Sequence, residues 1–288
     1  MERPARRRIA LGPALLALIA VGAGPRLALA MPEADFDALM EALSAGDFAV
    51  VEAFLEPRSA TSQQDPEFYV ILLNYAARKA DRGGMVVAQG EPREGDYALK
   101  DPETGEVVGF MGHREAWDEP LVVDAIHRTQ AALPGFRSRL DIHFGIVAVA
   151  ERIGRLDLAA DQLVAMLEIS REIDNRWTWG RVGSMDGDPQ EFMIQGVLPR
   201  TSAMFRAETA DGDRALVRVS NALVEHYPQL VYGHANLGVL AMVKGRYAEA
   251  RLHLERALAL DPLDEVVRGN LEQLAAFENA QTAPAKAD

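Results

Sequence analysis

Apolar residues recur at intervals of three and four along most of the chain after residue 30, which is the spacing of amphipathic α-helices. The clearest stretch is residues 231–262, where two apolar stripes are separated by Gly245 and the second stripe ends at Pro262. Glycine accommodates the left-handed residue that ends many helices, and proline cannot continue a helix. The stretch therefore predicts two antiparallel helices joined by a short turn.

Similar glycine turns recur earlier in the chain. A glycine followed by a short polar stretch and then an apolar helical pattern lies at Gly46, Gly154, Gly212 and Gly245. Pro228 and Pro262 are 34 residues apart, and a period of this size is typical of helical repeats. We expect a helix hairpin around each glycine, with the helix before Gly212 interrupted by Pro199.

Residues 84–112 do not follow the helical pattern. Short β-compatible runs cover residues 85–88, 97–100 and 106–110, and residues 101–105 (DPETG) have turn composition. We expect an antiparallel β-hairpin or a meander of two or three strands, with a loop of about four or five residues.

Helix starts are marked at Asp65 and Asp188, each of which precedes a proline and is placed to cap the helix.

With these signals the chain divides into six segments. They are a signal peptide (1–30), an N-terminal helix hairpin and helix (31–83), a β-hairpin insert (84–112), a central helical segment with a degenerate repeat (113–200), C-terminal repeats with a capping helix (201–277) and a disordered tail (278–288).

The first 30 residues have the composition of a secretory signal peptide. Four arginines between residues 3 and 8 precede an uncharged, mostly apolar run at residues 9–24, and Ala28-Leu29-Ala30 forms a cleavage site. We expect cleavage after Ala30 and a periplasmic or secreted mature protein with no transmembrane segment. The alternative is a retained membrane anchor, for which the apolar run is short.

Charge and cysteine content narrow the classes of function. The chain has 30 basic and 43 acidic residues and no cysteine. Without the arginine-rich leader the net charge is about −17, which disfavours binding to nucleic acid or to anionic lipid. Disulfides and thiol chemistry are excluded.

The stretch at residues 231–262 resembles the tetratricopeptide repeat (TPR) family. The matching positions are Leu237, Gly238, Ala241, Gly245, Tyr247, Ala250, Leu254, Ala257 and Pro262. The resemblance implies a mainly α fold, here an irregular TPR-like α-solenoid of helix hairpins with a small inserted β-hairpin or meander. The order of elements is also similar to that of exported bacterial TPR-containing proteins of undefined function.

The family binds peptides or proteins in a concave groove lined by the first helix of each repeat. The corresponding groove positions here are Tyr232, Ala235, Asn236, Val239, Met242 and Val243. Among them only Asn236 fits the polar clamp with which some family members hold a terminal carboxylate. An apolar groove of this kind suits an amphipathic helix or an extended apolar peptide, so the resemblance implies a non-catalytic scaffold with a protein or peptide partner.

A second candidate site lies in the non-repeat middle of the chain, around residues 137–179. Its residues are Arg139, Asp141, His143, Trp177 and Trp179. On one helix Arg139 and His143 would share a face, whereas Asp141 would lie well around from both. This set allows a small-molecule or glycan site, possibly in an enzyme, but a helix start with surface ion pairs, a partly buried histidine and packed tryptophans explains the same residues.

Catalytic and metal motifs are missing from the sequence. The six histidines do not form an HExxH or similar ligand pattern, and the chain has no G-x-S-x-G elbow and no glycine-rich phosphate loop. We therefore expect no catalytic residues, no bound metal and no cofactor.

Overall fold

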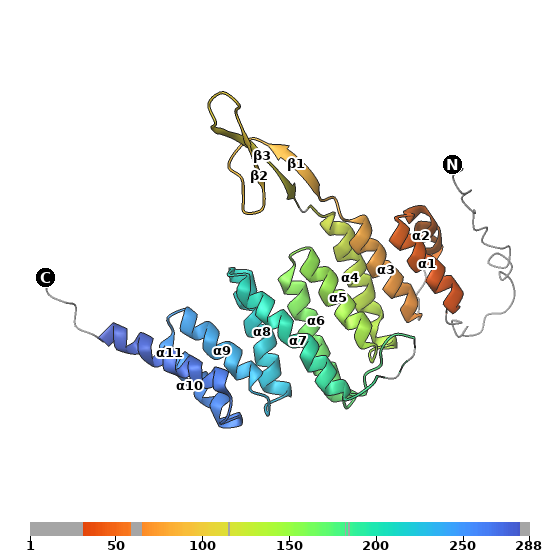
Figure 1. The fold of residues 1–288 in the computed structure, drawn as a ribbon. Coiled ribbons are helices and arrows are strands. Elements are labelled where there is room, and N and C mark those ends of the chain that lie inside the picture. Colours follow the sequence, from red (N-terminus) through yellow and green to blue (C-terminus); the bar gives the residue numbers. More distant parts are fainter. Residues whose placement is uncertain (1–30, 59–64, 115, 182, 184, 283–288) are drawn as a thin grey trace.

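Helix hairpins stack side by side into an elongated molecule, from α1 at one end to α11 at the other (Figure 1). The computed structural model describes residues 31–58, 65–114, 116–181, 183 and 185–282. The predicted signal peptide and residues 283–288 of the predicted tail lie outside the described residues. The helices are α1 (Glu33–Ala45), α2 (Phe48–Leu55), α3 (Pro66–Lys79), α4 (Glu119–Ala132), α5 (Leu140–Arg152), α6 (Leu156–Glu172), α7 (Pro189–Arg206), α8 (Ala210–His226), α9 (Tyr232–Val243), α10 (Tyr247–Leu260) and α11 (Glu265–Thr282).

Three of the four predicted glycine turns are confirmed. Gly46, Gly154 and Gly245 follow α1, α5 and α9 with φ angles of 73°, 74° and 72°. Glycine adopts this left-handed conformation without the steric cost of a Cβ atom. Each short connection turns the chain back, so that the next helix packs antiparallel to the one before.

The turn predicted at Gly212 is wrong, because this glycine lies inside the first turn of α8. The Thr209 hydroxyl caps that helix by accepting from the Gly212 N–H at 3.0 Å, and the left-handed residue of the turn is Glu208, with φ 50°. A Cβ atom on Gly212 would lie 2.5 Å from the carbonyl oxygen of Met204. The glycine therefore permits the close approach of α7 and α8.

The interruption predicted at Pro199 is also wrong, because α7 runs through it as one helix. Val197 and Met204 are buried on either side of the proline, so packing of the apolar face stabilises both halves. The Arg200 guanidinium donates to the carbonyl of Gly196, which adds a polar contact in the turn that the proline weakens.

The β-insert is a three-stranded antiparallel sheet of β1 (Gly84–Ala88), β2 (Tyr97–Lys100) and β3 (Val107–Arg114). The predicted hairpin is confirmed for β2 and β3, whose loop is closed by the Asp101 N–H donating to the Glu106 carbonyl at 2.9 Å. A meander is wrong, because the strand order is β1-β3-β2. The β1–β2 connection is long enough to carry β1 past β2 to the far edge of β3, and β3 extends to Arg114, beyond the expected end at 112.

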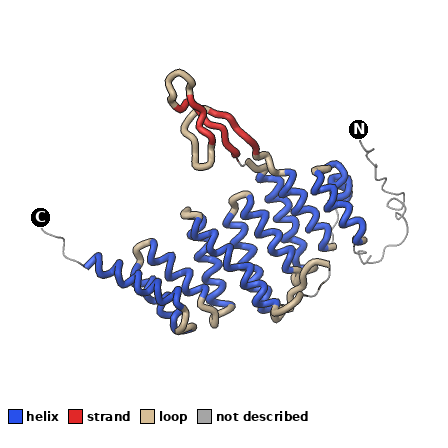
Figure 2. Tube along the Cα trace, viewed as in Figure 1, coloured by secondary structure: helices blue, strands red, loops and turns tan. Residues whose placement is uncertain are grey.

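The sheet is inserted in the turn between α3 and α4 and projects away from the helical layers (Figure 2). Two backbone hydrogen bonds join its ends at the base, from Arg82 N to the Ala116 carbonyl at 2.8 Å and from Asp118 N to the Ala80 carbonyl at 2.9 Å. The helices α3 and α4 therefore form a hairpin of their own, which the sequence pattern did not indicate.

One apolar core runs through the helical layers from Met31 to Leu240, and a smaller cluster joins α9, α10 and α11. Gly238 marks the close crossing of α9 and α10, because a Cβ atom there would lie 2.7 Å from Cγ of Leu254. At the C-terminus α11 continues to Thr282, so helix covers the start of the segment expected to be disordered. Among the helices of the described ranges, none is both long and apolar enough to cross a membrane.

Candidate functional site

The predicted groove residues lie along α9, and all but one of them keep some exposure to solvent. Val243 is 61% exposed, while Tyr232, Ala235 and Val239 are half-buried. Met242 is the exception, because it is buried in the cluster shared with α10 and α11. The groove face of α9 is thus defined by Tyr232, Ala235, Asn236, Val239 and Val243.

Asn236 is the polar group in the middle of this face. Asn236 as a whole is half-buried, and its side-chain Nδ2 atom is buried without a hydrogen-bond partner among the described residues. A buried donor without an acceptor costs about 1–3 kcal/mol.

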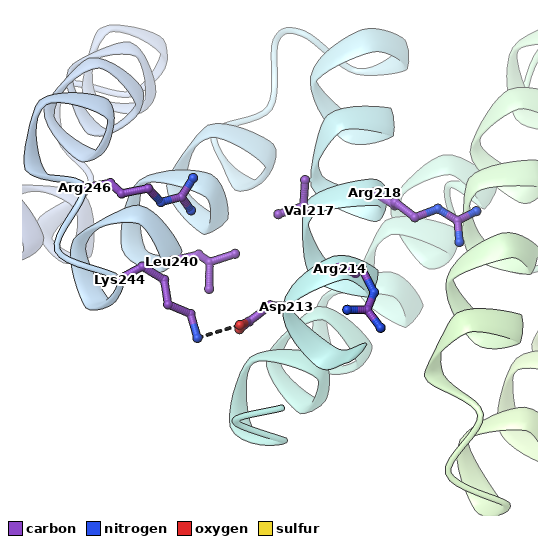
Figure 3. Close-up of a pocket in the computed structure, with 7 residues that line it drawn as sticks. All are labelled: Asp213, Arg214, Val217, Arg218, Leu240, Lys244 and Arg246. Carbon is purple, nitrogen blue, oxygen red and sulfur yellow. Dashed lines mark ion pairs between the residues drawn. The ribbon is translucent and has the colours of Figure 1, made fainter. Parts of the chain in front are cut away.

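An open pocket of about 440 Å³ lies beside the groove face, between α8 and α9 (Figure 3). Val217 of α8 and Leu240 of α9 form its apolar part, and Lys244 extends from the end of α9 to pair with Asp213 at 2.5 Å. The remaining lining residues are Arg214, Arg218 and Arg246. Sequence reasoning missed this pocket, because its walls come from two different hairpins.

The charges around the pocket are mostly positive, although the protein as a whole is acidic. Four of its lining residues are cationic and one is acidic. Arg214, Arg218 and Arg246 each pair with a carboxylate outside the lining, and all these pairs are solvent-exposed. Exposed pairs of this kind contribute about 0–1 kcal/mol, so an anionic group could replace the existing carboxylates at little cost.

The residues of the second candidate site come together, but inside the protein. Arg139 is the N-cap of α5 and only 8% exposed. Its guanidinium donates to both carboxylate oxygens of Asp141 at 2.8 Å and to Glu67 of α3 at 2.8 Å. The expected separation of Arg139 from Asp141 is wrong, because a capping residue outside the helix can fold its side chain back over the first turn.

The charge of Arg139 is stabilised inside this buried cluster. Burial opposes the charge of Arg139, but hydrogen bonds to Asp141 and Glu67 outweigh it and raise the pKa of the guanidinium. Glu67 is 5% exposed. The three side chains therefore join α3 to the start of α5 from within the core.

His143 is fully buried rather than partly buried. Its Nε2 lies 2.9 Å from the Arg137 carbonyl and its Nδ1 lies 2.7 Å from the Gln162 amide nitrogen. These partners require a neutral ring with Nε2–H as donor and Nδ1 as acceptor. Burial lowers the pKa of His143 to about 4, against the opposing effects of the Arg137 carbonyl and the Asp141 charge.

The two tryptophans of the set have different surroundings. Trp177 is 4% exposed, packs edge-on against His143 with ring centroids 5.4 Å apart, and has an indole N–H without an acceptor in the described part of the chain. Trp179 is 40% exposed and contacts Phe192. Backbone hydrogen bonds between residues 138–140 and Thr178 tie the tryptophan segment to the start of α5.

A pocket beside this segment does not involve the predicted set. A pocket of about 330 Å³ is lined by Phe136, Arg137, Ser138, Ile173 and Arg176 together with Pro134 and Gly135 of the short 3-10 helix after α4. None of Arg139, Asp141, His143 and the two tryptophans lines it. The side chains of the predicted set therefore connect helices to one another. Among the described residues, the set contains no nucleophile with a base beside it.

Sequence reasoning also missed a pair of histidines in contact, because its members are 19 residues apart. His234 of α9 and His253 of α10 face each other with Nδ1 atoms 3.0 Å apart. Burial lowers the pKa of both rings, which favours a neutral pair with one Nδ1–H donating to the other Nδ1. No group of three or more histidine, aspartate or glutamate side chains suited to a metal occurs within the described ranges.

Comparison with known protein families identifies one matching segment, which is the repeat at the C-terminal end of the helical stack. Residues 231–264 match the family described as Tetratricopeptide repeat, and this range contains the whole of α9 and α10. Compared with curated proteins, the chain matches none. The fold is mainly α and TPR-like, and α9 and α10 are the hairpin in which the tetratricopeptide repeat is recognisable by sequence.

Proposed function

We propose that this protein is an exported, non-catalytic scaffold that holds a protein or peptide partner against the groove face of α9. The tetratricopeptide repeat supports a role in protein interaction. The partner would be bound after export, in the periplasm of a bacterium or outside the cell.

The observation that carries the proposal is a stripe along α9 that is exposed at Val243 and half-buried at Asn236 and Val239. Asn236, Val239 and Val243 lie at intervals of three and four and so share one side of the helix. The opposite side is buried, including Leu237, Gly238 and Ala241. A helix that leaves part of such a stripe exposed presents a surface suited to an apolar partner segment.

The pocket between α8 and α9 supports the same role and suggests the chemistry of the partner. Val217 and Leu240 offer an apolar floor for one side chain, and Lys244 and Arg246 stand at its rim. A partner with an apolar anchor next to acidic residues would match both features.

Support for export comes from the contacts of Met31. The Met31 nitrogen donates to the Asp65 carboxylate at 2.8 Å, and the residue is 6% exposed. Cleavage after Ala30 would turn this nitrogen into a charged α-amino group. The amide hydrogen bond would then become a partly buried ion pair, which is a stronger interaction, so processing at this bond would stabilise the start of the fold.

Site-specific photo-cross-linking tests the proposal. A cross-linking amino acid placed at Val243, in the groove face, is expected to capture a reproducible partner from the cell envelope. Leu252 of α10 is the matched control, because it is 59% exposed but lies outside the groove face. Absence of a product from position 243, or the same products from both positions, would count against the groove as the binding surface.

A further inference from the structure

The inserted sheet exposes more apolar surface than its size explains. Met85, Val87 and Tyr97 are 62%, 69% and 69% exposed. The strand register places all three on one face, because Met85 pairs with His113 while Val87 and Tyr97 both pair with Met111. In the described residues no helix packs closely on the sheet.

The two edges of the sheet differ in protection. The edge strand β2 ends at Lys100, and its pairing with β3 is irregular between Leu99 and Lys100. A lysine and an irregularity are both devices that prevent further strand pairing. The other edge strand, β1 (Gly84–Ala88), is a regular run of glycine, methionine, two valines and alanine without charge or proline. Only β1 is therefore ready to accept another strand.

Backbone geometry shows which groups of β1 are available. Arg82 donates to the Ala116 carbonyl, and residues 82 and 116 continue the β1–β3 register. In an antiparallel pair, hydrogen-bonded and non-hydrogen-bonded positions alternate. Residues 84, 86 and 88 thus bond to β3, and the N–H and C=O groups of Met85 and Val87 point outward along the free edge.

We propose that β1 pairs with β1 of a second copy of this chain, antiparallel and centred on Val86. In this register Met85 of one copy faces Val87 of the other, and their outward backbone groups can form four hydrogen bonds. Gly84 faces Ala88, and Val86 faces Val86. All opposed side chains are apolar or absent, so the edge is complementary to itself under a two-fold axis.

A second copy fits this edge better than a charged segment would. The five residues of β1 offer no ionic partner, and full overlap of two such strands leaves neither copy with an unpaired outward group within β1. Because the sheet projects from the helices (Figure 1), two copies can pair through their β1 strands without contact between their helical layers. The contact is small, so the dimer is expected to be weak and to depend on protein concentration.

Sedimentation analysis of the purified protein with charged variants of Val86 tests this proposal. Two equal charges would face each other across the two-fold axis in V86K and in V86E, and each variant alone is expected to dimerise at least about tenfold more weakly. An equimolar mixture of the two variants should restore association, because lysine then faces glutamate. Ala98→Lys is the control, since Ala98 lies on the same face of the sheet but on the β2 edge.

The outcomes separate clearly. A wild-type dimer that is lost in both single variants, recovered in the mixture and unchanged in the A98K variant supports pairing through β1. Recovery in the mixture also shows that the variants are folded. A wild-type protein that stays monomeric up to millimolar concentration, or V86K protein that dimerises as well as wild type, overturns the proposal.

Discussion

Replacing Arg139 with alanine is expected to lower the free energy of unfolding by about 3–5 kcal/mol. The substitution leaves the carboxylates of Glu67 and Asp141 without their cation, and their side chains are only 7% and 15% exposed. Buried charge without a partner is among the most costly defects in a folded protein. Urea unfolding at neutral pH, followed by circular dichroism, measures the loss.

The chain contains a matched control for this experiment. Arg155 is the N-cap of α6, pairs with Asp157 two residues later and reaches Glu119 on a neighbouring helix, all at 2.7–2.8 Å. The arrangement repeats that of Arg139, but the three side chains are 35–53% exposed. Arg155→Ala should therefore cost no more than about 1 kcal/mol. Equal losses in the two variants would show that the Arg139 cluster is not a buried contact of the fold.

Acid is expected to destabilise the protein through His143. The pKa of this ring falls from 6.5 to about 4 on folding, chiefly because of burial. The unfolded chain therefore takes up a proton at higher pH than the folded chain. The stability that depends on neutral His143 is complete above pH 6.5 and is lost as the pH falls toward 4, with a total of about 3 kcal/mol.

The variant His143→Gln isolates this contribution, because glutamine does not titrate. Unfolding free energies of wild type and variant should differ by a constant amount above pH 6.5. Between pH 6.5 and 4 the difference should shift by about 3 kcal/mol in favour of the variant, whatever the carboxylates contribute to both proteins. A difference that does not change with pH would mean that folding does not shift the pKa of His143, as expected for a ring accessible to water.

The sequence predicted those elements that depend on local signals. Turns at Gly46, Gly154 and Gly245 followed from the conformational freedom of glycine, and the caps at Asp65 and Asp188 are confirmed by hydrogen bonds to the N–H groups of residues 67 and 190. Local signals gave wrong predictions where packing between helices determines the role of a residue. Gly212 is needed for a close approach to α7, and Pro199 is tolerated because the helix packs on both sides of it.

The candidate site shows the same limit. Sequence reasoning placed Arg139, His143 and Trp177 in one candidate site, but their burial depends on Glu67, which lies 72 residues before Arg139, and on Gln162 of α6. Neither partner is visible in a local pattern. The pocket between α8 and α9 was missed for the same reason, since its lining comes from both helices and the turn after α9.

Binding of the partner at the groove face of α9 is tested by the dissociation constant of the protein captured from position 243. Val243→Glu places a charge on the apolar stripe and is expected to weaken binding by about tenfold or more. Leu252→Glu places the same charge on an equally exposed position of α10 and should leave the dissociation constant unchanged. Equal affinities for the two variants would show that the partner does not bind at the groove face of α9.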